Sequence, residues 1–435
     1  MRIPSTSAWP SAFFAALIAL ATVYLVQLPS PLRLGPDASS YLQIASSIAD
    51  GHGANPPGTP SFPIGYPLLL AGLDTVGLGM PWALVALNLA FLILGTASLW
   101  VVLRRGLDLG EATAGAVCVL SLLSSSVAKH AVMPLSEMVF FGLAAAALAL
   151  LTLSATNGRV SLLAGGVVLA LAACTVRTAG IALAPAVVLT FRSGRSRIVA
   201  AIVGIAGAAF SIAAAPRYLD ELSGGWRDGP VRSGYREGRD LLELLGAAVG
   251  NIPESKIGTV SPFLIAIGAA TLPAIVAVLV RRRHCLGPVD GWVLGSLIVL
   301  FAWPADDSRF LLPLFPFLLG YGALLARRWR PVAVAYATLF AALGLVAIAL
   351  STRLTFSGQQ FPERYADGAM APTYRVAWGM AEPGDRAHVY RPALEVLRRY
   401  DPDPPGGRSR TRAHAPYQTV ARGVSPALSG DSPTG

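Results

Sequence analysis

The run VSLLAGGVVLALAACTVRTAGIALAPAVVLTF, residues 160–191, decides what kind of protein this is. It contains one charged residue, Arg177, near its middle. A stretch of about 17 to 25 apolar residues is long enough to cross a bilayer as a helix. The run therefore predicts two spans, 160–176 and 178–191, with a cation at the turn between them.

The composition of the whole chain agrees with this interpretation. Charged residues make up 13% of the 435 positions and hydrophobic residues 54%, and the mean hydropathy is +0.58. A typical soluble domain has roughly twice that charged share, about 25%. These values exclude a soluble globular enzyme and a disordered chain. They predict a protein whose main solvent is lipid, so the bilayer is its first expected partner.

The net charge of +10 comes almost entirely from arginine. The arginines fall in short clusters between apolar runs, which is typical of membrane topology signals and not of a nucleic-acid surface. We therefore expect no nucleic-acid partner. The three cysteines, Cys118, Cys174 and Cys285, form no C-x-x-C motif, so neither a disulfide framework nor a cysteine metal site is expected.

We predict an all-α polytopic membrane protein with about eleven transmembrane helices. The spans lie near residues 11–28, 81–103, 112–128, 132–153, 160–176, 178–191, 198–215, 258–280, 289–303, 310–326 and 331–351. With the N-terminus in the cytoplasm, the inner segments hold most of the arginines outside the long loop and the tail, including the clusters Arg104-Arg105 and 281–283. The short outer segments then hold single cations. This predicts a multi-pass protein of the plasma (inner) membrane with an extracytoplasmic C-terminus.

Every sizeable polar segment then falls on the outer face. We expect a transmembrane domain over 1–351 with outer loops at 29–80 and 216–257, a small extracytoplasmic segment at 352–403, and a disordered tail at 404–435. Helical spacing predicts interfacial helices at 37–49 and 66–78 in the first outer loop. An amphipathic helix at 237–249 either lies on the membrane surface or packs on the protein's own outer face.

Ionisable groups inside or beside spans are costly and are candidates for function. Arg177 either binds a phosphate through its planar fork of donors or anchors a helix end at headgroup level. Glu137 follows Pro134-Leu135-Ser136, and its position favours a first-turn acid that completes a helix cap. Lys129 and His130, just before it, can pair with Glu137 or with an anionic headgroup.

Two further outer positions carry acids. Asp306 and Asp307 lead into Arg309. Either this segment is a solvated turn with a local Asp–Arg pair, or Arg309 contacts a phosphate at the membrane surface. Two adjacent acids can hold a divalent cation, although this is weak evidence for a metal. Asp37 follows Pro36 at the start of a predicted helix, with Tyr41 one turn on. It is the candidate general base, because a carboxylate there could accept a proton from an attacking hydroxyl. Its ordinary alternative is a helix cap.

Taken in order, several stretches resemble the GT-C superfamily of membrane glycosyltransferases, in the bacterial branch related to protein O-mannosyltransferases and the lipid A aminoarabinose transferase. The stretches that carry this likeness are Gly35-Pro36-Asp37 with Tyr41, Phe62-Pro63-Ile64-Gly65-Tyr66-Pro67, Pro134-Leu135-Ser136-Glu137, Arg177-Thr178-Ala179-Gly180 and Ser308-Arg309-Phe310-Leu311-Leu312-Pro313. Together they cover roughly residues 1–330.

The resemblance implies a sugar donor linked to polyprenyl phosphate and used on the outer face, with an extracytoplasmic acceptor. By this likeness Asp37 would be the general base, and Arg177 and Arg309 would hold the donor phosphate. Glu137 and Lys129 would line the same cavity. Tyr41, His130 and Asp307 complete the expected substrate-binding residues.

Two rival functions stay open at this point. A lipid or solute transporter or flippase would place charges near mid-membrane and often show an internal repeat. A non-catalytic scaffold subunit of the same fold would not need Asp37. No Gly-rich phosphate loop or dinucleotide fingerprint occurs in the sequence, so we expect no nucleotide cofactor.

Overall fold

The structure is a computed structural model that describes residues 8–60, 62–191, 230–253, 256–302, 308–365 and 370–402. All regular structure in these residues is helical. By length and composition, four of the helices could cross a membrane: α4 (Pro81–Arg105), α7 (Glu137–Asn157), α13 (Ile257–Arg282) and α16 (Arg330–Thr355). The predicted all-helical fold of membrane type is therefore confirmed.

Shorter apolar helices accompany these four. They are α1 (Ala8–Leu25), α5 (Glu111–Leu122), α8 (Val160–Val176), η1 (Thr178–Leu183) with α9 (Ala184–Thr190), α14 (Pro288–Ala302) and α15 (Phe315–Leu325). Each coincides with a predicted span. The predicted span 198–215 lies outside the described residues, so the count of eleven and the orientation stay predictions.

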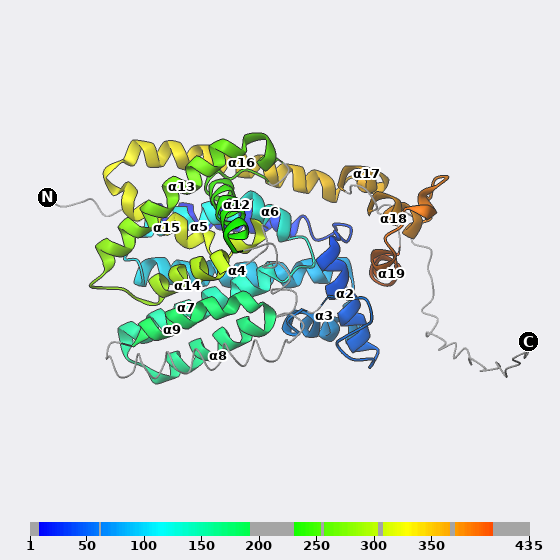
Figure 1. Cartoon of the computed structure of the whole chain (residues 1–435), viewed down its shortest axis with the longest axis horizontal. Coiled ribbons are helices and arrows are strands. Elements are labelled where there is room, and N and C mark those ends of the chain that lie inside the picture. Colours follow the sequence, from blue (N-terminus) through cyan, green and yellow to red (C-terminus); the bar gives the residue numbers. More distant parts are fainter. Residues whose placement is uncertain are drawn as a thin grey trace, which may run out of the picture.

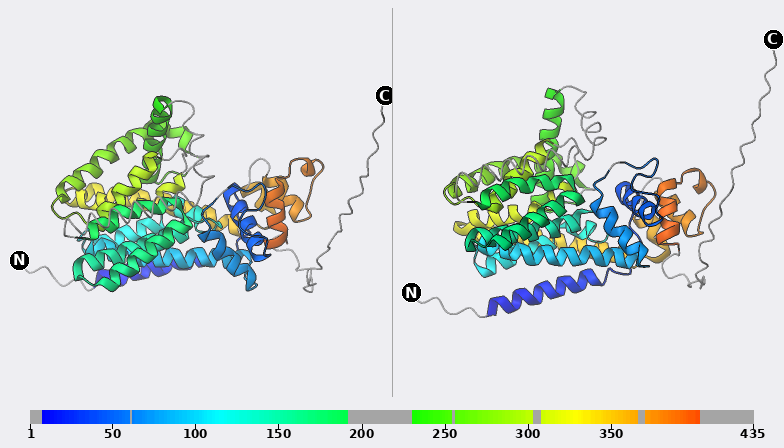
Figure 2. Two further views of the ribbon diagram at one scale, coloured as in Figure 1. Left: turned by 60° about the horizontal axis from the view of Figure 1, so that its bottom comes forward. Right: turned by 90° about the horizontal axis from the view of Figure 1, so that it is seen from below.

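The long helices run roughly parallel to the longest axis of the molecule, with α7 near the centre (Figure 1). Helix α7 packs between α4 and α8, and α14 packs against α9 and η1. In the apolar window of α7, 78% of the residues are buried, against 17% in α16. Helix α1 lies along the outside of the bundle (Figure 2), where it contacts α5 and α4. Helix α7 is therefore the central helix of the bundle.

One end of the bundle carries the first outer loop (Figure 1). Its two helices are α2 (Pro36–Ala49) and α3 (Gly65–Thr75). Gly35 precedes α2 and Pro36 occupies its first turn, where proline fits because no helical hydrogen bond is lost there. The side chains of Tyr41, Ile44 and Ala45 are buried on one face. This face fixes the rotation of α2 and hence the direction of Asp37.

The amphipathic segment 237–249 lies in α12 (Pro230–Gly250), which packs along α13. Two glycines allow this close approach. A Cβ at Gly246 would lie 1.9 Å from the carbonyl oxygen of Leu264, and one at Gly268 would lie 1.8 Å from that of Leu242. Leu245 is fully buried. Of the two alternatives for this helix, the structure therefore favours packing on the protein itself.

The segment after α16 folds back onto the first outer loop. It forms α17 (Phe361–Tyr365), α18 (Met370–Ala377) and α19 (Arg391–Tyr400), and α19 contacts α2. The hydroxyl of Tyr374 accepts a hydrogen bond from the backbone of Leu34 and donates one to the backbone of Leu32. Asp401 accepts from the Leu32 amide. The predicted tail at 404–435 lies outside the described residues.

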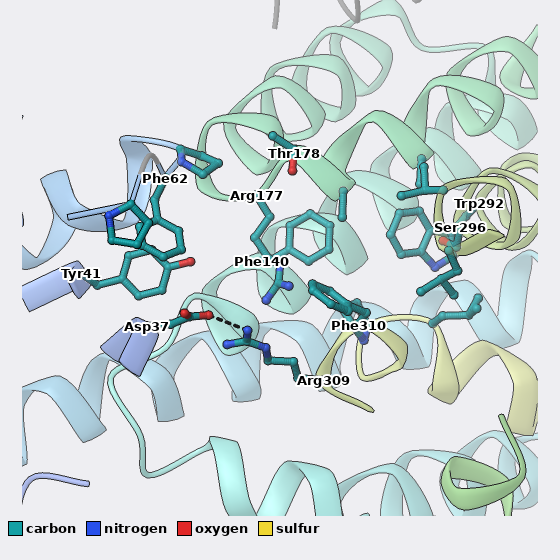
Figure 3. Close-up of a pocket in the computed structure, with 18 residues that line it drawn as sticks. Asp37, Tyr41, Phe62, Phe140, Arg177, Thr178, Trp292, Ser296, Arg309 and Phe310 are labelled. Atoms are coloured by element: carbon teal, nitrogen blue, oxygen red, sulfur yellow. Dashed lines mark ion pairs between the residues drawn. The ribbon is translucent and has the colours of Figure 1, made fainter. Parts of the chain in front are cut away.

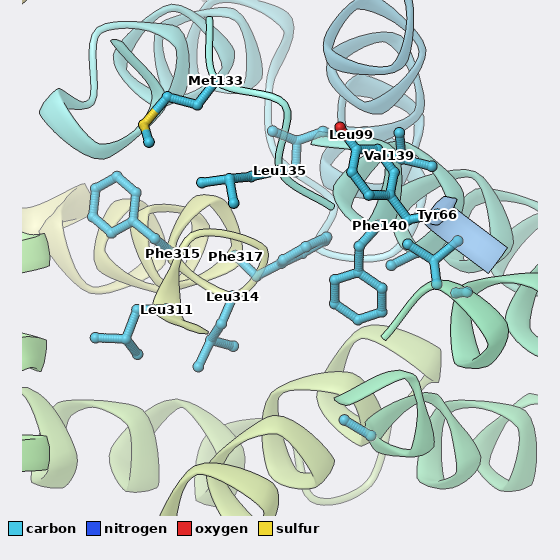
Figure 4. Packing of buried hydrophobic residues seen from close by; sticks show 14 of the residues in the cluster. Tyr66, Leu99, Met133, Leu135, Val139, Phe140, Leu311, Leu314, Phe315 and Phe317 are labelled. Carbon is cyan, nitrogen blue, oxygen red and sulfur yellow. The ribbon is translucent and has the colours of Figure 1, made fainter. Parts of the chain in front are cut away.

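Buried side chains of α3, α4, α7 and α15 belong to one hydrophobic cluster (Figure 4). Phe140 and Phe317 are each about 1% exposed, and Tyr66 and Leu99 are fully buried. Packing of this density holds neighbouring backbone segments in one arrangement. Phe140 of this cluster also lines the main cavity of the protein.

Candidate functional site

A cavity of about 300 Å³ lies between the first outer loop, η1, α14 and the segment that begins at η3 (Ser308–Leu311). Its polar lining comes mainly from Asp37, Tyr41, Arg177 and Arg309. Figure 3 shows Asp37 and Tyr41 at one end, the two arginines in the middle and Trp292 with Ser296 at the other end. The remaining walls are apolar, including Phe62, Phe140, Phe310 and Leu314.

Two carboxylates and two guanidinium groups meet at this cavity. Asp37 Oδ2 and Arg309 Nη2 form an ion pair of 2.5 Å, drawn as a dashed line in Figure 3. Arg177 forms an ion pair with Glu137, and Arg309 Nε lies 3.7 Å from Glu137 Oε1. These residues are far apart in the sequence, so the fold brings together four charges that mutually balance.

The local structure explains the position of Arg177. Helix α8 ends at Val176, and Arg177 is extended, with φ −147° and ψ 136°, so the chain turns there into η1. Gly180 makes the turn tight, because a Cβ there would lie 2.7 Å from the backbone of Cys174. The single charge in the run 160–191 thus projects into the cavity from a rigid turn.

Glu137 lies behind the arginines, because its side chain is only 1% exposed and does not line the cavity. It occupies the first turn of α7 as expected. Ser136, however, makes no capping hydrogen bond, and its hydroxyl lies 3.3 Å from that of Tyr41. Glu137 therefore positions the two guanidinium groups.

Tyr41 forms part of an aromatic wall. Its ring centroid lies 4.5 Å from that of Phe62 and 5.2 Å from that of Tyr66. Burial raises the pKa of Tyr41 to about 12. The phenol therefore stays protonated at neutral pH, which leaves Asp37 as the residue of the two that can act as a base.

Besides Glu137, three further expected site residues are not placed in this cavity by the described structure. Lys129 and His130 line a separate cavity of about 70 Å³ beside α6 (Ser125–His130) and α12. His130 is buried, with Nδ1 2.8 Å from the carbonyl oxygen of Ser126. Asp307 lies outside the described residues, as does Asp306.

The described residues give no candidate metal centre. Within them, no group of three or more His, Cys, Asp or Glu side chains is arranged to hold a metal ion. Asp37 in the cavity and Glu137 behind it both pair with arginines. The expectation of a divalent cation rests on Asp306 and Asp307.

Most of the lining residues were not predicted as site residues, and four of them are prominent in the cavity. Phe310 lies under both arginines, whose Cζ atoms are 5.0 Å (Arg177) and 5.6 Å (Arg309) from its ring centroid. Phe140 forms the wall between the arginines and Trp292. Trp292 and Ser296 lie one helical turn apart in the span 289–303. That spacing is the one signal that could have indicated them.

The site suits a ligand with an anionic group and an apolar part. Guanidinium forks bind phosphate oxygens bidentately, and the apolar walls accept hydrocarbon. Asp37 adds a carboxylate close to the position where such an anion would bind.

Neither a comparison with protein-family models nor one with curated proteins finds a match. The solved structures that are similar to the chain include two of ArnT from Cupriavidus metallidurans. The apo structure is 16% identical with a TM-score of 0.48, and the alignment covers 91% of this chain and 75% of that one. The structure bound to undecaprenyl phosphate is 15% identical with a TM-score of 0.46, and the alignment covers 91% and 76%.

What the fold and the site define is a helical membrane protein with a charged cavity at one end of its bundle. The similarity to ArnT is too distant to carry an inference about activity.

Proposed function

We propose that this protein is a membrane glycosyltransferase. It would move a sugar from a polyprenyl phosphate carrier to an acceptor outside the cytoplasm, with Asp37 as the general base. The acceptor would be a hydroxyl- or amine-bearing glycan, lipid or protein.

One observation carries the proposal. Arg177 and Arg309 meet the carboxylate of Asp37 in a cavity whose other walls are mostly apolar. A small soluble phosphate compound has no hydrocarbon part that would contact these apolar walls. A lipid phosphate needs both parts, because its chain stays in the hydrocarbon layer while its phosphate stays at the surface.

The chemistry of transfer fits these groups. The acceptor hydroxyl would lose its proton to Asp37 as its oxygen forms a bond to the anomeric carbon of the sugar. The bond between that carbon and the phosphate oxygen would break, and the lipid phosphate would leave with the electron pair. Arg177 and Arg309 would stabilise the charge that develops on the phosphate.

The ion pair between Asp37 and Arg309 would require the donor to bind before Asp37 accepts a proton. A phosphate bound at Arg309 would compete with Asp37 for the guanidinium group. The carboxylate would then be free to accept a proton only when the donor is present.

The test is sugar transfer by purified full-length protein in proteoliposomes. Labelled polyprenyl phosphate sugars are supplied with a crude cell-envelope acceptor, and the wild type is compared with Asp37→Asn. We expect loss of at least 100-fold in the variant, the usual lower range for removal of a general base, while binding of the lipid phosphate is retained.

Asp108→Asn is the matched control. Asp108 is an exposed residue between α4 and α5 with φ 51°, a conformation that asparagine also adopts readily. Equal transfer by Asp37→Asn and wild type would remove Asp37 from the mechanism. Absence of transfer from every donor would favour a flippase, for which labelled-lipid flipping is the assay, or a scaffold subunit.

A further inference from the structure

The end of the cavity away from Asp37 holds two buried polar atoms that the reaction outlined above does not use. They are the indole nitrogen Nε1 of Trp292 and the hydroxyl oxygen Oγ of Ser296, both on α14 (Figure 3). Trp292 is 2% exposed and Ser296 6%. Neither atom has a hydrogen-bond partner within the part of the chain that the structure describes.

Such atoms are costly to leave unpaired. A buried polar group without a partner destabilises a protein, and the indole N–H of a buried tryptophan usually has an acceptor. A ligand that offers oxygen atoms at this end would remove that cost. Trp292 can only donate, whereas Ser296 can donate or accept.

The chemistry of the proposed donor identifies which part belongs there. This step rests on the proposed function. An isoprenoid chain has no hydrogen-bond acceptor, and the phosphate is assigned to Arg177 and Arg309. The remaining oxygen-bearing part is the sugar. The neighbouring rings of Phe140 and Trp292, whose centroids are 6.2 Å apart, supply an apolar surface for the C–H face of a sugar ring.

Charge further restricts the kind of sugar. Arg177 and Arg309 already pair with Glu137 and Asp37, so a protonated amine at the Trp292 end would be an additional cation without a pair. Among the described residues, the only carboxylate that lines the cavity is Asp37, at the opposite end. Burying an ammonium group without a counter-charge is far more costly than burying a hydroxyl, and an ammonium group cannot accept a hydrogen bond from Trp292 Nε1.

We propose that Trp292 and Ser296 form the sugar subsite of this cavity and that the subsite selects a neutral, hydroxyl-bearing sugar over one that carries an ammonium group. Both are specificity-determining residues that would contact the sugar at positions remote from the bond that breaks.

The test measures lipid binding and not transfer. Purified full-length protein in nanodiscs binds radiolabelled polyprenyl phosphate, which is displaced by unlabelled polyprenyl phosphate, by a polyprenyl phosphate hexose or by a polyprenyl phosphate aminopentose. Trp292→Phe removes the N–H but keeps an aromatic ring, and Ser296→Ala removes the hydroxyl. Trp82→Phe is the control, because Trp82 is 46% exposed at the start of α4.

We expect the hexose lipid to compete better than the aminopentose lipid on the wild type. Trp292→Phe and Ser296→Ala should each weaken binding of the hexose lipid about five- to tenfold, as expected for one lost hydrogen bond. Binding of unglycosylated polyprenyl phosphate should be unchanged. The control variant should match the wild type for all three lipids.

Three results would overturn the subsite: unchanged binding of the hexose lipid in both variants, an equal loss for the unglycosylated lipid, or equal competition by the aminopentose lipid. In these cases polyprenyl phosphate still binds, so the proposed donor class survives. If the wild type binds no polyprenyl phosphate at all, the proposed function fails and the subsite fails with it.

Discussion

Glu137 is the residue that joins the two arginines of the site. Its carboxylate is 1% exposed and pairs with Arg177, while its Oε1 lies 3.7 Å from Arg309 Nε. The two guanidinium groups would repel each other if this charge were removed. An ion pair that is buried in this way destabilises the protein strongly when only one partner is removed, because the other charge stays buried without compensation.

This gives a double-mutant prediction. Glu137→Gln alone and Arg177→Gln alone should each lower the midpoint of thermal unfolding of the detergent-purified protein. The double variant should be less destabilised than the sum of the two, by a coupling of about 1–3 kcal/mol, which is typical for residues in direct contact.

The pair Arg104 and Glu111 provides the comparison. Their side chains are 32% and 56% exposed at the other end of the bundle, so the same cycle there should give less than about 1 kcal/mol. Additive effects at Glu137 and Arg177 would show that the carboxylate does not hold that arginine in solution.

At this scale the sequence predicted which residues carry charge beside the spans but not how they pair. Arg177 was identifiable because it interrupts an apolar run. The pairing of Glu137 was not, because its position after Ser136 fits an ordinary helix cap equally well. Trp292 and Ser296 were missed because a tryptophan and a serine are unremarkable within a span, and only the folded cavity brings them opposite Asp37.

Among the elements, α19 is bonded to both helices of the first outer loop, α2 and α3, through the side chains of Arg399 and Tyr400. Arg399 donates to both oxygens of Asp50, at 2.7 and 3.0 Å, and to Asp74 at 2.7 Å, and Tyr400 donates to Asp74. Asp50 follows α2 and Asp74 lies in α3. One arginine thus ties the last described helix to both helices of the loop that carries Asp37.

These contacts predict acid sensitivity of the segment 370–402. Hydrogen bonds from Arg399 lower the pKa of Asp50, and those from Arg375 lower the pKa of Asp385 to about 2. A carboxyl whose pKa is depressed by folding stabilises the fold above its unfolded value near 4, and this stabilisation is lost as the pH falls through the folded value. Amide hydrogen exchange in 370–402, corrected for intrinsic rates, should accelerate between about pH 4 and pH 2, before that of α7.

Arg399→Gln should accelerate exchange in the same segment already at pH 7. Arg398→Gln, its exposed neighbour with no ion pair among the described residues, should leave exchange unchanged. Simultaneous acceleration in α7 and α19 would mean that the segment does not open separately from the bundle.

The helices themselves were largely predictable, since apolar runs coincide with α4, α8, α13, α14 and α16. A long apolar run has few alternatives to a helix in lipid, because every backbone group must be paired within the segment. The contact of α19 with α2 was not predictable. It depends on surface ion pairs between residues more than 300 positions apart, such as Arg399 and Asp50, for which a single sequence carries no periodic signal.

On the scale of the whole molecule, an arginine cluster and the site lie at opposite ends of the bundle (Figure 1). The site, the first outer loop and α17–α19 lie at one end, and the loop between α13 and α14 lies at the other (Figure 1). That loop follows Arg281, Arg282 and Arg283. Arg282 pairs with the buried Asp290, which also accepts a hydrogen bond from Tyr321. Arginine clusters mark the cytoplasmic side of membrane proteins, so the site end should face outward.

A native cysteine allows this orientation to be tested. Cys285 is exposed in the loop between α13 and α14, whereas Cys118 is buried and Cys174 is half-buried. In intact bacterial cells that express the protein, a membrane-impermeant maleimide should not label Cys285, and labelling should appear after permeabilisation. In a Cys285→Ser background, Asn55→Cys places a thiol at an exposed position of the first outer loop and should be labelled in intact cells. Cys285→Ser alone should give no signal in either condition.

The opposite pattern at both positions would put the site on the cytoplasmic face, which would exclude an extracytoplasmic acceptor. Labelling of both positions from one side would mean that one of the spans between them does not cross the membrane.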